Sequence, residues 1–389
     1  MFKRILMSVM PLLLLSGCWF GNTPDYDEFT TVFSGERTIL FDGDEKWDFE
    51  KFLRQELKDH PEMECIDLLK FCCQAAFGTD TESGRSKKDF FYEFNRIIPD
   101  DNLDLIRVTS PDTARVNLAA WKAAGLPPEW LFRMTVMDPD FSDGKEKLQE
   151  YIQIAARIIP ERKMNFSAAE FQEFAGKFPV DQLKNIAHGT NYLTPAYRLI
   201  HSRNFNAIPV LKKAAALPGT KTGIIAIDGR AASGKTTLAG QLKIILNAQI
   251  IHMDDFFLPP EMRTAVRLEE AGGNVHYERF KEEVLTSLTE NKAFSYRIFD
   301  CKKNRFNGSR MIWKSQWTIV EGAYSTHPKF GKYADLTVFY DISPEEQMRR
   351  IYERNGAKAA KTFQNKWIPL EENYIRSFNI KNKADLILQ

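Results

Sequence analysis

The residues most able to do chemistry form one short stretch, GRAASGKTT at residues 229–237, which fits the pattern G-x-x-x-x-G-K-[ST]. Glycines in this pattern let the backbone wrap around a phosphate group, so that successive N–H groups point at anionic oxygen. Lys235 would neutralise the β- and γ-phosphates, and the Thr236 hydroxyl would bind Mg²⁺. The stretch therefore predicts a loop for the Mg²⁺ complex of ATP or GTP. The expected nucleotide-binding residues are Gly229, Ala231, Ala232, Ser233, Gly234, Lys235, Thr236 and Thr237.

Acidic residues follow two apolar runs further along the chain. Asp254 and Asp255 come at the end of residues 249–253, and Glu321 ends the run at residues 317–320. Ligands of open α/β sheets bind at the carboxyl ends of the strands, so these acids are expected beside the phosphate loop. Asp254 could accept a proton from an attacking hydroxyl, and Glu321 could organise Mg²⁺. The alternatives are a helix N-cap for Asp254 and an exposed strand-end side chain for Glu321.

A basic helix is predicted after residues 343–346, SPEE, which combine capping-box spacing with proline at the first helical position. Arg350 and Arg354 are four residues apart on this helix, Arg349 is adjacent, and Gly356 is the expected stop. Arginines there could clamp the negative charge of a phosphoryl group during its transfer. A solvated basic face is the alternative interpretation.

These residues require a scaffold that brings their positions together. Short apolar runs, rich in β-branched residues, alternate with helical stretches such as residues 238–246. The alternation predicts a parallel sheet with helices on both faces. We therefore expect an α/β P-loop NTPase domain over residues 222–389. Its expected strands are residues 224–227, 249–253, 317–320, 336–342 and 386–388.

Four motifs, in their order along the chain, resemble the uridine kinase and phosphoribulokinase family of P-loop kinases. They are the phosphate loop, the DDFF motif at 254–257, the VEG motif at 320–322 and the arginine helix. The resemblance covers residues 222–389, under half of the chain. It implies that Asp254 is the catalytic base and that Glu321 accompanies Mg²⁺. It also implies catalytic roles for Lys235, Arg350 and Arg354. The residues that it implies for the phosphoryl acceptor are Asp255, Phe257, His276, Asp300 and Arg305.

The acceptor region departs from the family pattern. Phe257 and Phe299 stand where uridine kinases usually carry tyrosine, and Lys302, Lys303 and Asn304 replace the family's basic and histidine positions. The phosphate-binding residues match the pattern, whereas the nucleoside pocket differs from it.

Residues 27–211 are predicted to form a mostly α-helical domain of unknown function. Apolar residues recur at helical spacing in residues 47–57, 66–77, 148–159 and 168–178. Ser167 and Glu170 have capping-box spacing, and residues 121–131 are expected to form a helix end and a packed turn. A change of pattern places the boundary with the second domain near residue 212.

The first eighteen residues resemble an export signal. Lys3 and Arg4 precede an apolar run at residues 5–15, which is too short to span a bilayer. The ending LSGC resembles a bacterial lipoprotein box, in which Cys18 would carry the lipid and attach the protein to a membrane. One alternative is an extension that is never processed. Another is a cytoplasmic protein, and the requirement for ATP favours this second alternative.

The other cysteines, Cys65, Cys72, Cys73 and Cys301, have no zinc-site spacing, and buried packing is expected for the first two.

Length and charge set the remaining limits. The 389 residues suffice for two domains of about 100–200 residues each. The formal net charge of +1 gives no bulk attraction to nucleic acid.

From the motifs and the family resemblance, we expect a kinase that transfers phosphate from ATP or GTP to a hydroxyl of a small molecule, such as uridine. The alternatives are a nucleotide-gated switch protein and a P-loop kinase that acts on a nucleotide sugar or a protein; the oligomeric state is not predicted.

Overall fold

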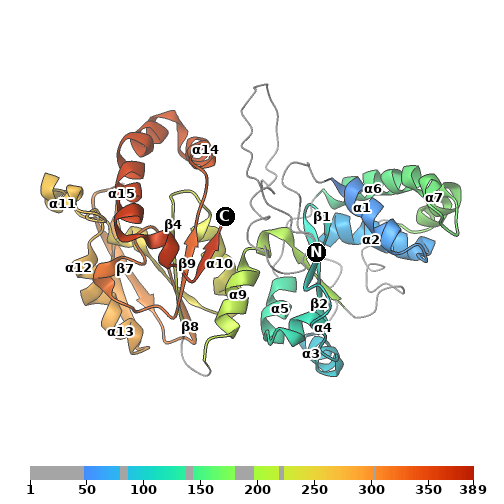
Figure 1. Cartoon of the computed structure of the whole chain (residues 1–389), viewed down its shortest axis with the longest axis horizontal. Coiled ribbons are helices and arrows are strands. Elements are labelled where there is room, and N and C mark those ends of the chain that lie inside the picture. The colour runs from blue at the N-terminus through green and yellow to red at the C-terminus, as the bar shows by residue number, and fades with distance from the viewer. Residues whose placement is uncertain (1–47, 79–85, 137–142, 180–196, 219–222, 302) are drawn as a thin grey trace, which may run out of the picture.

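A parallel sheet of five strands, in the order β10-β9-β4-β8-β5, forms the centre of the second half of the chain (Figure 1). The computed structural model describes residues 48–78, 86–136, 143–179, 197–218, 223–301 and 303–389. All five predicted strands are confirmed, and the predicted α/β class with them. Their bounds are β4 Gly223–Gly229, β5 Gln249–His252, β8 Trp317–Glu321, β9 Leu336–Tyr340 and β10 Leu386–Leu388.

The central strand β4 explains why this sheet has two covered faces. Every residue of β4 is buried. Side chains alternate across a strand, so Ile225 and Ile227 join one hydrophobic core while Ile224 and Ala226 join another on the opposite face. Two cores on opposite faces are what a near-continuous apolar strand predicts.

The register of the strands brings their carboxyl ends to one edge. Ile227 of β4 pairs with Glu321 of β8, which in turn pairs with His252 of β5. Gly229 at the end of β4 pairs with Tyr340 at the end of β9. The phosphate loop, the acid at the end of β8 and the acids after β5 therefore meet at the same edge of the sheet.

The second half also contains an antiparallel hairpin that the sequence did not predict. It consists of β6 Phe294–Asp300 and β7 Arg305–Ile312. Most of β7 is exposed, so it lacks the apolar run by which the other strands were recognised. The helices of this half are α10 Lys235–Leu246, α11 Ala265–Glu269, α12 Tyr277–Phe280, α13 Thr286–Thr289, α14 Pro344–Thr362, α15 Ile368–Phe378 and α16 Ile380–Lys383.

Helix α14 starts as predicted, and its first helical segment ends at Gly356, also as predicted. Ser343 caps it by accepting from the backbone N–H of Glu346 at 3.2 Å. Gly356 leaves the helical conformation, with φ of 77°, and the helix then resumes as far as Thr362. The predicted stop at Gly356 therefore separates two helical segments that together make up α14. A π-helical turn, Phe363–Trp367, joins it to α15.

The first half is mostly helical, as predicted, and it also contains a three-stranded antiparallel sheet that was not predicted. The strands β1 Ile106–Ser110, β2 Thr113–Asn117 and β3 Tyr197–His201 lie in chain order. They are short, and β3 joins from far along the chain, so no local pattern marks the sheet. The helices are α1 Phe49–Asp59, α2 Cys65–Phe77, α3 Lys87–Arg96, α4 Leu118–Ala123, α5 Pro128–Thr135, α6 Gly144–Ile158, α7 Ala168–Gly176 and α9 Ala207–Ala215.

Two local predictions in this half are confirmed. Ser167 and Glu170 form a reciprocal capping box at the start of α7. Trp121, near the end of α4, is fully buried and donates from Nε1 to the carbonyl of Pro127 at 3.1 Å. The turn between α4 and α5 is thus packed against its own helix end.

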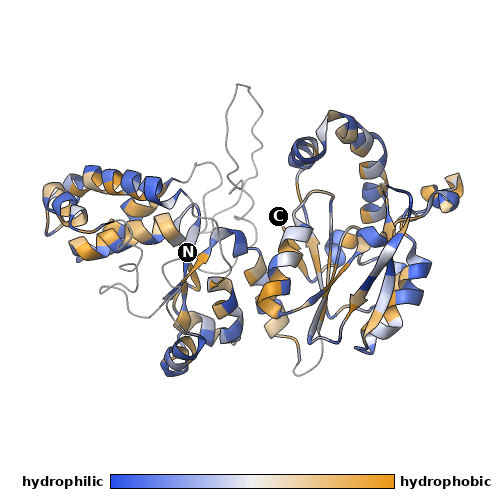
Figure 2. Ribbon diagram, turned by 180° about the vertical axis from the view of Figure 1, so that it is seen from behind, coloured by the Kyte–Doolittle hydropathy of each residue, from blue (hydrophilic) through white to orange (hydrophobic). Residues whose placement is uncertain are grey.

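The two halves share one hydrophobic core where α5 and α9 meet α10 (Figures 1 and 2). The rings of Trp130 and Trp317 lie 6.1 Å apart in an edge-to-face arrangement. Arg133 in α5 donates to the carbonyl of Ile245 in α10 at 2.8 Å. The boundary expected near residue 212 falls inside α9, whose Leu211 is fully buried in this core.

Residues 1–18, including Cys18, lie outside the described residues. Among the helices of the described ranges, none is long and apolar enough to cross a bilayer. Cys72 and Cys73 are buried in the first core, and Cys65 is half-buried against it. Burial raises the pKa of Cys73 to about 12, so these thiols pack as small apolar side chains.

Candidate functional site

The loop between β4 and α10 has the backbone geometry that its glycines predict. Gly229 has φ of +139°, and an added Cβ would lie 2.1 Å from the carbonyl oxygen of Tyr340. Gly234 has φ of +110° and directly precedes α10. Ala232 also has positive φ, at 63°. The chain therefore turns sharply here and brings the N-terminus of α10 to the carboxyl edge of the sheet.

Lys235 and Thr236 begin α10 and face this loop. Lys235 is buried, and its Nζ donates to the carbonyls of Gly229 at 2.8 Å and Arg230 at 2.5 Å. The Thr236 hydroxyl donates to Glu321 Oε2 at 3.1 Å. Backbone carbonyls thus hold the ammonium group inside the loop. Phosphate oxygens of a ligand could replace these carbonyls as its hydrogen-bond acceptors.

Glu321 links the ends of two strands. Its other carboxylate oxygen lies 2.5 Å from His252 Nδ1 at the end of β5. A hydroxyl and a carboxylate in contact are oxygen ligands of the kind that Mg²⁺ prefers. In the described part of the chain, no three His, Cys, Asp or Glu side chains are grouped closely enough to hold a metal ion by themselves. Thr236 and Glu321 would therefore bind Mg²⁺ together with phosphate oxygens and water.

Asp254 lies in the turn Met253–Phe256 that follows β5, and its side chain opens into the cavity. Solvent in the cavity reaches it, yet the surrounding walls still limit its hydration. This partial desolvation and the charge of Glu321 raise the pKa of Asp254, while Lys235 opposes the rise. A carboxylate with a raised pKa beside a phosphate loop is suited to accept a proton.

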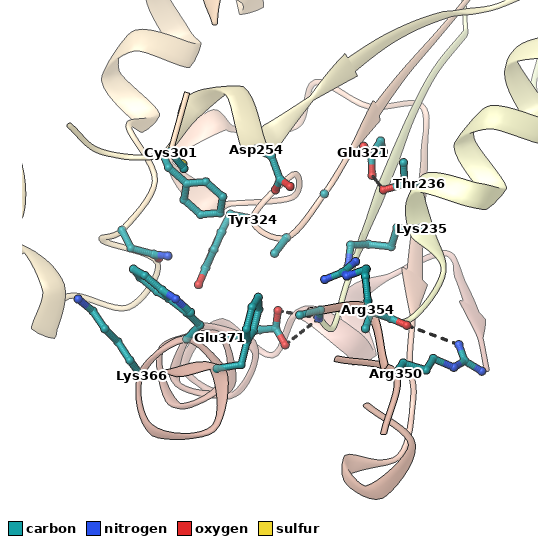
Figure 3. A pocket seen from close by; sticks show the side chains of 18 of the residues that line it. Lys235, Thr236, Asp254, Cys301, Glu321, Tyr324, Arg350, Arg354, Lys366 and Glu371 are labelled. Carbon is teal, nitrogen blue, oxygen red and sulfur yellow. Dashed lines mark hydrogen bonds between the residues drawn. The ribbon is translucent and has the colours of Figure 1, made fainter. Parts of the chain in front are cut away.

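Two arginines approach the loop from α14, which together with α15 we call the lid (Figure 3). Arg350 Nη1 lies 3.5 Å from the carbonyls of Ala232 and Ser233, and its Nε donates to Glu346 at 2.5 Å. Arg354 lines the same cavity. Arg349, in contrast, pairs with Glu346 and Glu353 on the helix surface and is not a lining residue. The helix thus presents two of its three arginines to the loop.

These groups surround one cavity of about 680 Å³ (Figure 3). One part of its wall is the phosphate loop, and another part is apolar and aromatic. The second part could hold the body of an organic acceptor while the first holds phosphate. Its apolar lining residues are Phe257, Leu258, Leu268, Tyr324, Phe363 and Trp367.

The predicted loop residues are brought together, although they do not all face the cavity. Six of them line it: Ala231, Ala232, Gly234, Lys235, Thr236 and Thr237. Gly229 forms the turn beneath them. Ser233 is fully buried, and its hydroxyl has no hydrogen-bond partner in the described part of the chain.

Of the predicted acceptor residues, only Phe257 lines the cavity. Asp255 is buried and accepts from the Tyr296 hydroxyl at 2.9 Å, which ties the turn to the hairpin. His276 caps α12 by accepting from the backbone N–H of Arg279 at 3.3 Å. These two side chains therefore hold the walls in place rather than form the cavity surface.

The remaining two predicted acceptor residues lie on the hairpin. Asp300 and Arg305 pair across the ends of β6 and β7. Asp300 accepts from the backbone N–H of Lys303 at 3.1 Å, which closes the hairpin turn. The neighbouring Cys301 lines the cavity instead.

The sequence did not reveal two buried acids that contact the loop. Asp228, at 1% exposure, accepts hydrogen bonds from Gly229, Tyr324, Thr326 and Tyr374. Glu371 of α15 accepts from the backbone N–H of Ala231. An acid directly before the first loop glycine was visible in the sequence. The position of Glu371 depends on how α15 folds back, and no sequence signal marked it.

The strand order and the loop geometry define an α/β domain of the P-loop type. No family model and no curated protein matches this chain. Two solved structures align at 19% identity, each covering 48% of this chain. One is a possible uridine kinase from Bacillus stearothermophilus, with 97% of its chain covered and a TM-score of 0.38. The other is described as a candidate fructose transport system kinase from Silicibacter sp. TM1040, with 99% covered and a TM-score of 0.40. Similarity this distant carries no argument about function, which rests on the site geometry.

Proposed function

We propose that the chain is a kinase that transfers the γ-phosphoryl group of ATP or GTP to a hydroxyl of a small organic molecule. The observation that supports the proposal is the meeting of Lys235, the Thr236–Glu321 pair and Asp254 around one cavity. That cavity also has an aromatic region, which a nucleotide-hydrolysing loop alone would not require. The proposal therefore includes an organic acceptor beside the phosphates.

The proposed mechanism follows from what each side chain can do. Lys235 exchanges its two carbonyl partners for phosphate oxygens, and Arg350 and Arg354 neutralise charge on the transferred group. Bound Mg²⁺ would supply further charge neutralisation, held by Thr236 and Glu321. Asp254 accepts the proton of the attacking hydroxyl. Most of the rate enhancement would come from positioning and electrostatics.

The aromatic wall favours an acceptor with a planar part, and a nucleoside such as uridine fits this description. Polar contacts would come from Asn274, whose Oδ1 is buried and has no hydrogen-bond partner in the described ranges. Arg263 is a second polar lining residue. A nucleotide sugar or a protein side chain remains the alternative acceptor.

The test is ATP consumption with a panel of nucleosides and sugars, followed by mass spectrometry of the product. Asp254→Asn should lower the rate by about 10²–10⁴-fold, the usual contribution of a general base, and should leave nucleotide binding intact. Glu261→Gln is the control because Glu261 is exposed and does not line the cavity. Failure of every acceptor, or full activity of Asp254→Asn, would contradict the proposal.

A switch protein is the second candidate. The shared core of α5, α9 and α10 would let a nucleotide-dependent change at the loop reach the first half of the chain. NTP hydrolysis that needs no acceptor and gives no phosphorylated product would favour this candidate.

For residues 1–18 we propose attachment to a membrane through a lipidated Cys18, on the LSGC motif alone. The alternative is a cytoplasmic protein. Fractionation of the untagged protein tests the proposal. Wholly soluble protein that retains residues 1–18 would contradict it.

A further inference from the structure

Glu371 occupies an unusual position for an acidic side chain, directly on the phosphate loop. Both of its carboxylate oxygens accept from the backbone N–H of Ala231, at 3.0 and 2.9 Å (Figure 3). Only 4% of the residue is exposed. Glu371 also lines the cavity that holds Lys235 and Asp254. A buried anion from α15 is thus already bound to the loop.

A second side chain fastens this contact. Gln347 of α14 donates from Nε2 to Glu371 Oε1 at 3.1 Å and to the carbonyl of Ala231 at 3.1 Å. The same residue of the loop is therefore held through its N–H by α15 and through its carbonyl by α14. Both helices of the lid are docked on the loop through Ala231.

Burial is the largest influence on the Glu371 carboxyl. It raises the pKa of Glu371 above its ordinary value, although the charge of Lys235 and the hydrogen bonds from Ala231 and Gln347 act in the opposite direction. The stabilising groups are those that a phosphate oxygen would use in this loop, namely a backbone N–H and the loop lysine. The carboxylate is therefore a chemical substitute for a phosphate oxygen.

A phosphate oxygen cannot take the Ala231 N–H while the carboxylate keeps it. The two anions would also repel each other, since interactions between charges are strong where water is scarce. We propose that Glu371 competes with the nucleotide's phosphates for the loop, so that binding of a nucleoside triphosphate displaces its carboxylate. On this basis, Glu371 helps to determine how the site discriminates between ligands whose phosphate groups carry different charges. The inference rests on the proposed nucleotide site.

The same helix has an anchor that does not compete. Tyr374, one turn beyond Glu371, donates from its hydroxyl to Asp228 Oδ2 at 2.8 Å. A neutral hydroxyl bound below the loop has no conflict with phosphate. Displacement of Glu371 can therefore proceed while Tyr374 keeps α15 attached.

The alternative is that Glu371 only fastens the lid. A purely structural tie would be weakened by mutation, and ligand affinity would then fall or stay constant. A competing anion makes the opposite prediction, because its neutralisation frees the loop for phosphate. The sign of the change in ATP affinity separates the two.

The experiment measures the binding of ATP and ADP, with Mg²⁺, to the full chain by calorimetry. Glu371→Gln keeps an oxygen that can accept from Ala231 and removes the charge. We expect ATP affinity to rise on the order of tenfold, within the usual range of coupling between sites, and ADP affinity to rise less because ADP carries less charge. Glu353→Gln is the matched control, since it removes the same charge from an exposed position on α14.

Each outcome decides the matter. Unchanged or weaker ATP binding by a folded Glu371→Gln protein would overturn the inference, and so would an equal gain in Glu353→Gln. Glu371→Ala, which also removes the acceptor oxygen, should again tighten ATP binding if Glu371→Gln does not fold. If the wild type and both variants bind no nucleotide, the proposed function fails as well. Equal binding by all proteins, with transfer still abolished by Asp254→Asn, would refute the inference alone.

Discussion

Asp228 offers the sharpest test of how the site is held together, because one buried carboxylate collects five hydrogen bonds. Its Oδ1 accepts from the backbone N–H groups of Gly229 at 2.7 Å and Tyr324 at 3.1 Å. Its Oδ2 accepts from the N–H and hydroxyl of Thr326 at 3.0 and 2.6 Å and from the Tyr374 hydroxyl at 2.8 Å. Asp228 thus joins the loop, the segment after β8, and α15.

Asp228→Asn changes shape very little but cannot satisfy these donors. An amide has one accepting oxygen and one donating NH₂ group. In one orientation the NH₂ group faces the Thr326 N–H, and in the other it faces the N–H groups of Gly229 and Tyr324. Either way at least one backbone donor is left buried and unpaired.

The expected cost follows from these contacts. A lost hydrogen bond to a charged acceptor costs about 1.5–3 kcal/mol, and a buried unpaired donor costs about 1–3 kcal/mol. We therefore expect Asp228→Asn to lower the free energy of unfolding by roughly 3–5 kcal/mol, a large part of the 5–15 kcal/mol of an ordinary protein.

Urea denaturation measures this loss as a shift of the midpoint at constant slope. Asp385→Asn is the control, since Asp385 also accepts from a backbone N–H and a hydroxyl, those of Thr337, but in an exposed position. It should cost no more than about 1 kcal/mol. A loss below about 1 kcal/mol for Asp228→Asn would refute the reasoning from unpaired donors.

Three further predictions concern Gly229 of the loop and Asp254. Gly229→Ala should abolish nucleotide binding in equilibrium dialysis, because the new Cβ would lie 2.1 Å from the carbonyl oxygen of Tyr340; binding at wild-type affinity would contradict this. The raised pKa of Asp254 predicts that kcat/KM falls as the pH is lowered through that value, since the base must be ionised. The same raised pKa means that the folded state favours the protonated carboxyl of Asp254 over the ionised one. Asp254 therefore adds to the free energy of unfolding at low pH, and this contribution is lost as the pH rises through its pKa. Asp254→Asn should therefore retain or increase the free energy of unfolding at pH 7, and a clear loss would contradict this sign.

The sequence predicted the elements whose signals are local. The inner strands β4 and β8 are apolar because both of their faces are buried, and the loop carries glycine at Gly229 and Gly234, where φ is positive. The hairpin β6–β7 and the sheet β1–β3 escaped prediction because pairing stabilises them, and exposed or short strands show no apolar run.

The site was predictable to the same extent. The sequence singled out Lys235, Thr236, Asp254 and Glu321 because each lies at the glycine loop or near the end of a strand, and the structure brings these four side chains to one cavity. Glu371 was not, since its partner Ala231 lies 140 residues earlier in the chain. The predicted acceptor contacts rested on a family pattern, and the hairpin and α12 keep most of those side chains out of the cavity.

The core shared by α5, α9 and α10 has a thermodynamic consequence for the whole chain. Elements packed in one core tend to unfold together, so any ligand free energy is distributed over both halves. A nucleotide at 100 times its Kd would contribute about 2.7 kcal/mol to that common transition. The first half would then melt at a temperature set partly by the nucleotide concentration, although none of its described residues lines the cavity. Nucleotide bound at the loop would therefore raise the thermal stability of helices that do not contact it.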